Sequence, residues 1–108
     1  MMNILLIDND TSRHSDHEEN IDCSGREHLL IIKESVSEEE LKENQFDVYV
    51  VHHANVKEYK YVYQNQLGNY RIFFTGSCDK PRDNGTFGYF ADPKAMYNRV
   101  NQILKNDS

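Results

Sequence analysis

MNILLIDND, at residues 2–10, is the stretch that decides the fold class. It is a continuous apolar run of strand length that ends abruptly in acidic residues. An apolar run without alternation is typical of a strand covered by helices on both faces, as in a parallel sheet. Four similar runs follow, at 28–34, 46–51, 70–75 and 87–91. Five such runs separated by helix-length gaps predict one α/β domain over residues 1–108, with crossover connections.

Three of the gaps carry helix signals. Ser37 and Glu40 form a capping box, which predicts a helix that begins directly after Ser37. A second helix is expected over 55–67, with Gly68 as its stop. Its core-facing residues are predicted to be Val56, Tyr59, Tyr63 and Leu67. A third helix should begin at Asp92-Pro93, with Asp92 as its cap. Its apolar face is predicted to be Met96, Val100, Ile103 and Leu104.

Two connections carry weak helix signals. Residues 11–26 should hold the first helix, but Ile21 and Cys23 are their only apolar residues. That helix is expected to be short, displaced or partly disordered, and His14 and His17 are expected to be solvated. Residues 78–85 contain Pro81 and an Asn-Gly pair, and so indicate a loop. The helix between the fourth and fifth strands is therefore predicted to be short or missing.

Composition excludes several functions. The formal net charge is −6, and residues 1–50 hold 13 acidic side chains against four Lys and Arg. Binding to a nucleic-acid backbone needs dense positive charge, so no nucleic-acid partner is expected. No apolar run approaches the length of a membrane span, so no membrane association is expected. Two distant cysteines, Cys23 and Cys78, do not suggest a disulfide and favour a cytoplasmic location.

Polar residues follow several of the strands. Asp8, Asn9 and Asp10 follow the first, and His52 ends the third. Thr75 ends the fourth, Tyr89 lies within the fifth, and Asp92-Pro93 comes after it. Since the carboxyl ends of parallel strands share one edge of the sheet, we expect these positions to meet there.

The order of these elements and end residues resembles the receiver domain of bacterial response regulators (CheY-like). The resemblance implies a flavodoxin-like sandwich with a five-stranded parallel sheet of order 2-1-3-4-5. It also implies a phosphorylation site with an acidic pair, a phosphoacceptor aspartate, a Thr or Ser, and a lysine. Asp8 and Thr75 match, but Asn9 replaces the second acid, His52 the acceptor, and Asp92 the lysine. In-line phosphoryl transfer needs a carboxylate nucleophile, a metal and a cation, so the resemblance implies a pseudo-receiver that is not an enzyme and needs no cofactor.

Such a domain would act through protein contacts, with a partner or as a homodimer. The shortened connection before the fifth strand is expected to leave Tyr89, Tyr97 and Val100 open as an interaction face. Asp8, Asp10 and Asp92 are expected to crowd one site, where a charged His52 would hydrogen-bond one of the carboxylates.

An alternative class of function uses the acidic cleft itself. Asp8 and Asp10 loosely match the DxDx[TV] motif of haloacid-dehalogenase-type phosphatases, which would make the protein a phosphotransfer-type enzyme. Asp8, Asp10 and His52 are also weak candidates for metal ligands in a small α/β metal- or ligand-binding protein. Adjacent His52 and His53 should point to opposite sides of the sheet, so at most one would face the cleft.

Overall fold

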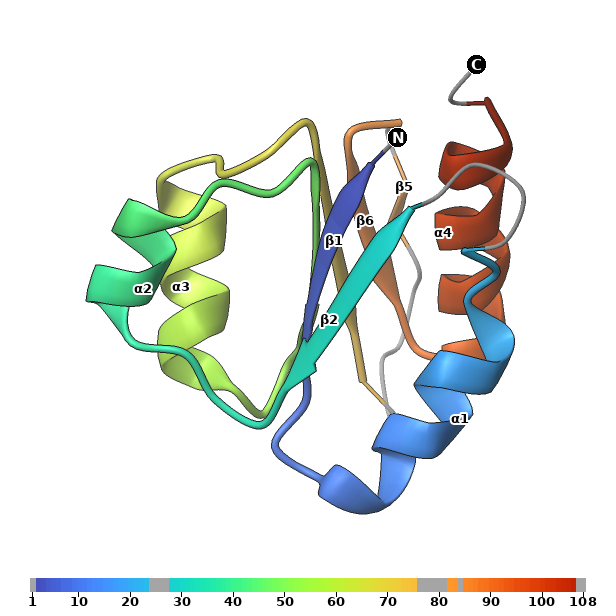
Figure 1. Ribbon diagram of the computed structural model, residues 1–108, viewed down its shortest axis with the longest axis horizontal. Helices are drawn as coiled ribbons and strands as arrows, with labels where there is room; N and C mark the ends of the chain where they lie inside the picture. Colours follow the sequence, from blue (N-terminus) through green and yellow to red (C-terminus); the bar gives the residue numbers. More distant parts are fainter. Residues whose placement is uncertain (1, 24–27, 76–81, 84, 107–108) are drawn as a thin grey trace.

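The apolar runs form one sheet with helices on both faces (Figure 1). A computed structural model describes residues 2–23, 28–75, 82–83 and 85–106. The strands are β1 (Asn3–Ile7), β2 (Leu29–Lys33), β3 (Val48–His52), β4 (Tyr70–Phe74), β5 (Arg82–Asp83) and β6 (Phe87–Phe90). The helices are the 3-10 turn η1 (Thr11–Arg13), α1 (His14–Asn20), α2 (Glu38–Glu43), α3 (Val56–Gln64) and α4 (Pro93–Asn106). None of the described helices could cross a bilayer.

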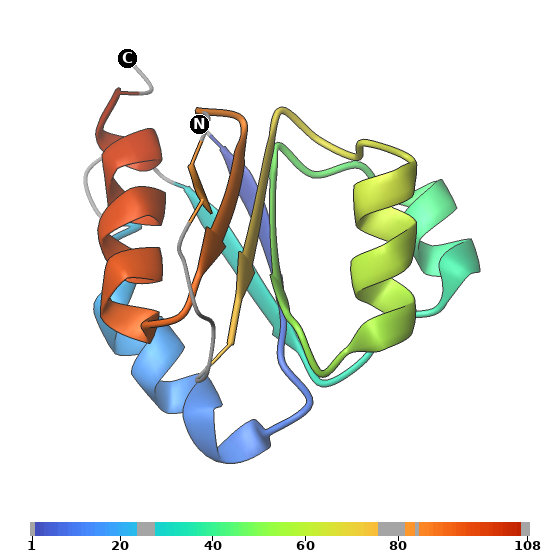
Figure 2. The same cartoon turned by 180° about the vertical axis from the view of Figure 1, so that it is seen from behind.

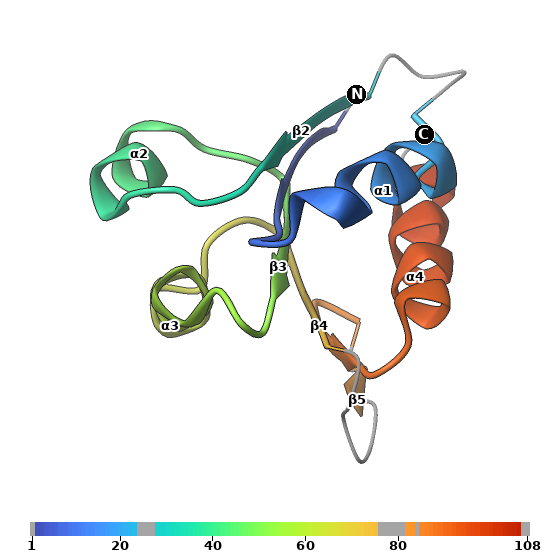
Figure 3. The same cartoon turned by 90° about the horizontal axis from the view of Figure 1, so that it is seen from below.

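The sheet order is β2-β1-β3-β4-β6-β5. The five long strands are all parallel, so the predicted order 2-1-3-4-5 and the flavodoxin-like fold are confirmed. Figures 2 and 3 show α1 and α4 on one face of the sheet and α2 and α3 on the other. This arrangement brings the ends of β1, β3, β4 and β6 together at one edge, as the sequence predicted.

Two apolar layers sandwich the sheet. Alternate residues of β1 divide between them: Ile4 and Leu6 face α4, while Leu5 and Ile7 face α3. The predicted apolar face of α4 is confirmed, since all four of its residues are buried: Met96, Val100, Ile103 and Leu104.

The predicted inward face of α3 is wrong at two positions. Val56 is 51% exposed and Tyr63 is 50% exposed, whereas Val62 and Glu58 are buried. A glutamate can occupy the inward position because its carboxylate accepts hydrogen bonds from Asn55 and from the Val36 amide. The helix ends at Gln64, before Gly68, which adopts a left-handed φ of 72°.

The structure describes parts of both connections that carried weak helix signals, residues 11–26 and 78–85. The first helix is short, as predicted: α1 has seven residues and follows the η1 turn. In the described part of the β4–β6 connection there is no helix; instead β5 pairs antiparallel with β6, an element the sequence did not predict. Most of the loop predicted at 78–85, including Cys78, lies outside the described residues. Cys23 carries a free thiol.

Candidate functional site

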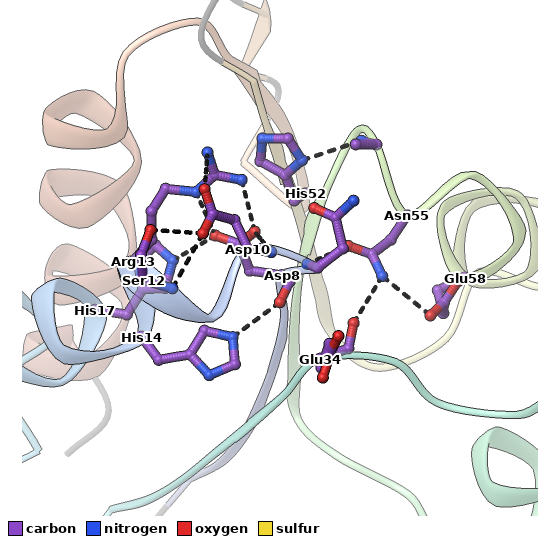
Figure 4. A network of polar contacts seen from close by, with 12 residues as sticks. Asp8, Asp10, Ser12, Arg13, His14, His17, Glu34, His52, Asn55 and Glu58 are labelled. Carbon is purple, nitrogen blue, oxygen red and sulfur yellow. Dashed lines mark hydrogen bonds and ion pairs between the residues drawn. The ribbon is translucent and has the colours of Figure 1, made fainter.

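Asp8 is the central residue of the site. It follows β1 directly, and its side chain is 0% exposed. One carboxylate oxygen, Oδ1, accepts from the Asp10 amide at 3.0 Å and from Arg13 Nη2 at 2.7 Å. The other, Oδ2, accepts from Arg13 Nε at 2.8 Å and interacts with His17 Nε2 at 2.8 Å (Figure 4). A carboxylate offers about four acceptor positions, so the side chain of Asp8 is fully occupied by the protein itself.

Arg13 and His17 reach Asp8 because of the turn that follows β1. Asp10 caps η1 by accepting a hydrogen bond from the Ser12 amide, which starts the helical path. Positions four residues apart lie on the same side of a helix, so Arg13 and His17 project together toward the strand end. His14 lies between them and contacts the Asp8 carbonyl through Nε2 at 2.8 Å. The expectation that His14 and His17 are merely solvated is therefore wrong.

The environment of Asp8 favours its charged form. Burial alone would raise the pKa of this carboxyl, but the hydrogen bonds from Arg13 and His17 outweigh it. The pKa of Asp8 therefore lies well below its usual range. The same hydrogen bond raises the pKa of the Arg13 guanidinium. The bidentate geometry of Arg13 with Asp8 is the strongest form of such a pair.

A tyrosine extends this network into the core. His17 is 1% exposed, and its Nδ1 lies 2.7 Å from the Tyr97 hydroxyl. Burial, followed by the charges of Asp16 and Asp8, raises the pKa of Tyr97, which keeps its hydroxyl protonated. The two ring nitrogens of His17 thus make two hydrogen bonds, Nδ1 with the Tyr97 hydroxyl and Nε2 with Asp8 Oδ2. Tyr97 on α4, His17 on α1 and Asp8 after β1 form one continuous chain of hydrogen bonds.

Asn55 organises the other side of the site. It is 6% exposed, and its Oδ1 accepts from the Asn9 amide at 2.8 Å. Its Nδ2 donates to the Glu34 carbonyl at 3.0 Å and to Glu58 Oε2 at 3.1 Å. One amide side chain thus joins the loops that follow β1, β2 and β3, as Figure 4 shows.

No carboxylate of the described residues hydrogen-bonds His52, in contrast to what was expected. Its Nδ1 accepts from the Ala54 amide at 3.0 Å, and its ring packs edge-on against Phe74. Burial lowers the pKa of His52, with smaller contributions from neighbouring charges. The imidazole is therefore neutral near pH 7. The carboxylate contact expected of His52 is made by His17 instead.

Of the remaining acidic candidates, Asp10 lies close to Asp8, since its Oδ2 is 3.4 Å from Nη1 of the same Arg13. Asp10 is exposed and caps η1, and Asp92 is exposed and accepts a hydrogen bond from the Lys94 amide, as the predicted cap of α4. Among the described residues, no group of three His, Cys, Asp or Glu side chains is placed to hold a metal ion. Asp8, Asp10 and His52 are thus not arranged as a metal site. The predicted crowding holds for Asp8 and Asp10, which share Arg13, but no described contact adds Asp92 to them.

The predicted interaction face is only partly open. Val100 is 0% exposed, so it belongs to the core and cannot contact a partner. Tyr97 is half-buried against the α4-side layer, whereas Tyr89 packs on the α3-side layer with its hydroxyl 3.0 Å from His53 Nδ1. The end of the loop also folds back, because Arg82 pairs with Tyr89 in the β5–β6 ladder. The edge of β6 is therefore covered there, and not stripped as the sequence suggested.

Thr75 lies half-buried at the end of β4, and its amide donates to the Phe90 carbonyl at 2.9 Å. The position thus matches the strand end that the sequence predicted. The Tyr89 hydroxyl, however, engages His53. Rings of Tyr59, Phe73 and Tyr63 continue this aromatic group along α3 and β4.

The fold and the strand-end residues define a flavodoxin-like α/β sandwich whose central acid is neutralised from within. Comparisons with protein-family models, with curated proteins and with solved structures find no match for this chain.

Proposed function

We propose that this chain is a degenerate receiver-like domain that works as a protein-protein interaction module and not as a phosphoryl-transfer enzyme. The observation that carries the proposal is the saturation of Asp8 by Arg13, His17 and the Asp10 amide. A receiver needs the corresponding carboxylate free to hold a metal ion. Here the Arg13 guanidinium supplies the positive charge in place of a metal ion.

The other strand-end residues support the same proposal. His52 stands where a receiver carries its nucleophilic aspartate, and its lone pair on Nδ1 is already engaged by the Ala54 amide. Asp92 stands where the phosphate-binding lysine belongs, and it caps α4. A carboxylate at that position repels a phosphoryl group. Phosphorylation in the manner of a receiver is therefore not expected.

The alternative function, a metal- or phosphoryl-handling cleft, requires Asp8 to exchange its protein partners for a ligand. Breaking a bidentate arginine pair whose carboxylate is buried and whose guanidinium is partly exposed costs about 3 kcal/mol, which the new ligand would have to supply. No feature of the described residues favours that exchange.

Incubation with acetyl phosphate, or with beryllofluoride, in the presence of Mg²⁺ tests the first half of the proposal. Intact-mass spectrometry should show no phosphoryl adduct, and amide NMR spectra should not change with beryllofluoride. A phosphoryl adduct in good yield at any residue would overturn it.

The interaction role is tested at Tyr89. This member of the predicted face packs on the α3-side layer and is half-exposed. The Tyr89 ring contacts the rings of His53 and Tyr59, and Tyr59 stacks on Tyr63; aromatic side chains are enriched in interface cores. Self-association by analytical ultracentrifugation, and partner capture, should weaken in Tyr89→Ala. Tyr97→Ala is the comparison on the opposite layer. If Tyr89→Ala stays folded and associates as the unmodified chain does, the interface lies elsewhere.

A further inference from the structure

β2 forms an open edge of the sheet, because it stands at the end of the strand order (Figure 1). The Leu29 amide donates to the Met2 carbonyl, and the Lys33 carbonyl accepts from the Asp8 amide, both at 3.0 Å. Hydrogen bonds to one neighbour recur at every second residue of a parallel strand. Leu30 and Ile32 therefore direct their N–H and C=O groups away from β1, toward a side where no described strand lies.

This edge lacks the devices that usually protect an exposed strand. Charged side chains, prolines and bulges discourage strand pairing. β2 reads Leu-Leu-Ile-Ile-Lys, with one charge at its end, and its register with β1 is uninterrupted. Leu29 is 49% exposed, and the three residues after it are only partly buried. An apolar, regular and open edge is suited to accept another strand.

A partly open notch lies beside the strand on the α2 side. Its volume is about 140 Å³, and its apolar walls come from Leu5, Ile31, Val36 and Phe46. A cavity of ~150 Å³ holds a group the size of benzene, so this notch suits one aliphatic side chain. Side chains of an added strand point alternately to the two faces of the sheet, and every second one lies on the Ile31 side.

Lys33 and Glu40 also line the notch and pair with each other at 3.1 Å, and the surroundings beyond this pair are acidic. A larger depression of about 740 Å³ shares Val36 and Glu40 with it, and is lined by Glu38, Glu40 and Glu58 with Lys57 as its one basic side chain. Glu34 and Glu39 add two more exposed carboxylates nearby in the sequence. A second copy of the chain at this edge would bring two such acidic groups together. Charge complementarity therefore favours a basic occupant.

We propose that the β2 edge binds an extended, basic segment of a partner protein by strand addition, with one apolar side chain in the notch. Main-chain hydrogen bonds to Leu30 and Ile32 hold the segment, the notch selects an aliphatic residue, and the glutamates select lysine or arginine on either side of it. This surface lies at the opposite end of the strand order from β6 and does not depend on Tyr89 or on the state of Asp8.

The probe is a fluorescein-labelled peptide of alternating lysine and valine, long enough to span β2. Fluorescence anisotropy at low salt should show saturable binding, weakened by added salt. The same peptide with every backbone nitrogen methylated, which offers no N–H donor along either edge, should bind at least about tenfold more weakly, as should a peptide with glutamate in place of lysine. In amide NMR, the Leu30 and Ile32 signals should shift and become protected from hydrogen exchange.

Two protein variants sharpen the test. Ile32→Pro removes an outward N–H without touching the ladder to β1, a position where an edge strand tolerates proline. It should weaken binding at least about tenfold. Glu38→Lys and Glu39→Lys change the same charge in the same first turn of α2, but only Glu38 lines the depression. Glu38→Lys should weaken binding several-fold more than Glu39→Lys, whereas Tyr89→Ala should bind as the unmodified chain does.

Several results would overturn the proposal. They are the absence of saturable binding up to about 1 mM peptide, equal binding of the N-methylated peptide, or unchanged Leu30 and Ile32 amide signals in the bound state. A β2-edge homodimer in sedimentation experiments without peptide would replace the proposed occupant and also overturn it. The amide signals come from the unmodified chain, so they decide the matter even if Ile32→Pro does not fold.

Discussion

Replacing Arg13 by methionine removes the cation that neutralises Asp8 and keeps most of the length of the side chain. The carboxylate is 0% exposed and loses two hydrogen bonds, of 2.7 and 2.8 Å, together with its main positive partner. Removing one member of a buried pair costs about 3–5 kcal/mol. The side chain of Arg13 is 35% exposed, so water can partly replace it, and the lower value of about 3 kcal/mol applies.

The effect should depend on pH in a defined direction. The pKa of Asp8 is depressed in the folded protein, so its stabilising contribution is present above the ordinary carboxyl range and is lost as the pH falls toward the folded pKa. In Arg13→Met, burial acts against fewer opposing hydrogen bonds, so the pKa of Asp8 rises. As the pH is lowered, Asp8 therefore becomes protonated at a higher pH in the variant than in the unmodified chain, and the cost of its unpaired charge disappears. The difference in the free energy of unfolding should shrink from about 3 kcal/mol at neutral pH to about 1 kcal/mol near pH 3.

Urea unfolding followed by circular dichroism at several pH values measures this difference. The thermal midpoint at neutral pH should fall by about 12 °C, at ~4 °C for each kcal/mol. Arg71→Met is the matched control, because Arg71 is also partly buried but donates to the neutral carbonyls of Leu67 and Gly68. It should cost about 1 kcal/mol without a marked pH dependence. The reasoning fails if Arg13→Met costs no more than Arg71→Met, or if its cost grows as the pH is lowered.

Three further predictions concern the same site. Tyr97→Phe leaves the buried Nδ1 of His17 without its hydrogen-bond partner and should lower the free energy of unfolding by about 1–2 kcal/mol in urea titrations. Asn55→Ala removes the side chain that hydrogen-bonds the loops after β1 and β2 to the loop after β3. It should lower the free energy of unfolding by about 2–3 kcal/mol and broaden the amide NMR signals after β1 and β2. The pKa of His52, measured by NMR, should lie below that of a free histidine, because burial disfavours the charged ring.

Each of these has a control or a contrary outcome. Tyr63→Phe alters a half-exposed hydroxyl and should be nearly neutral, so an equal loss in both tyrosine variants would contradict the role of Tyr97. Asn65→Ala removes only an exposed bond to the Tyr61 carbonyl and should cost far less than Asn55→Ala. A pKa of His52 above the free value would indicate a carboxylate partner that the site does not provide.

The sequence predicted the sheet well because burial on both faces of a parallel strand leaves an unmistakable apolar run. The capping box at Ser37 and the apolar stripe of α4 were equally local signals, and both correspond to the structure. The inward face of α3 was not predictable from apolar spacing. Its central position is Glu58, whose burial depends on Asn55 and Val36, residues that hydrophobic periodicity does not reveal.

The site was predicted at the right edge of the sheet but with the wrong partners. Asp8 was singled out from its place after β1, yet Arg13 and His17 were missed, because their segment has few apolar residues. One signal was available in the sequence. A basic residue and a histidine four apart, directly after an acid that ends a buried strand, lie on one side of a helical turn and can reach back to that acid. His17 contacts the Asp8 carboxylate in place of His52, because the helical turn after β1 places its Nε2 2.8 Å from Asp8 Oδ2.

The measurement that tests the central claim most directly is a Mg²⁺ titration followed by amide NMR, with Asp8, Asn9, Asp10 and His52 as reporters. If Arg13 and His17 occupy the carboxylate in place of a metal ion, these signals should show no saturable shift in the millimolar range, and Arg13→Met should be more responsive than the unmodified chain. A saturable shift of these amides in the unmodified chain, with a dissociation constant of about 1 mM or lower, would contradict the account and restore the acidic cleft as a metal site.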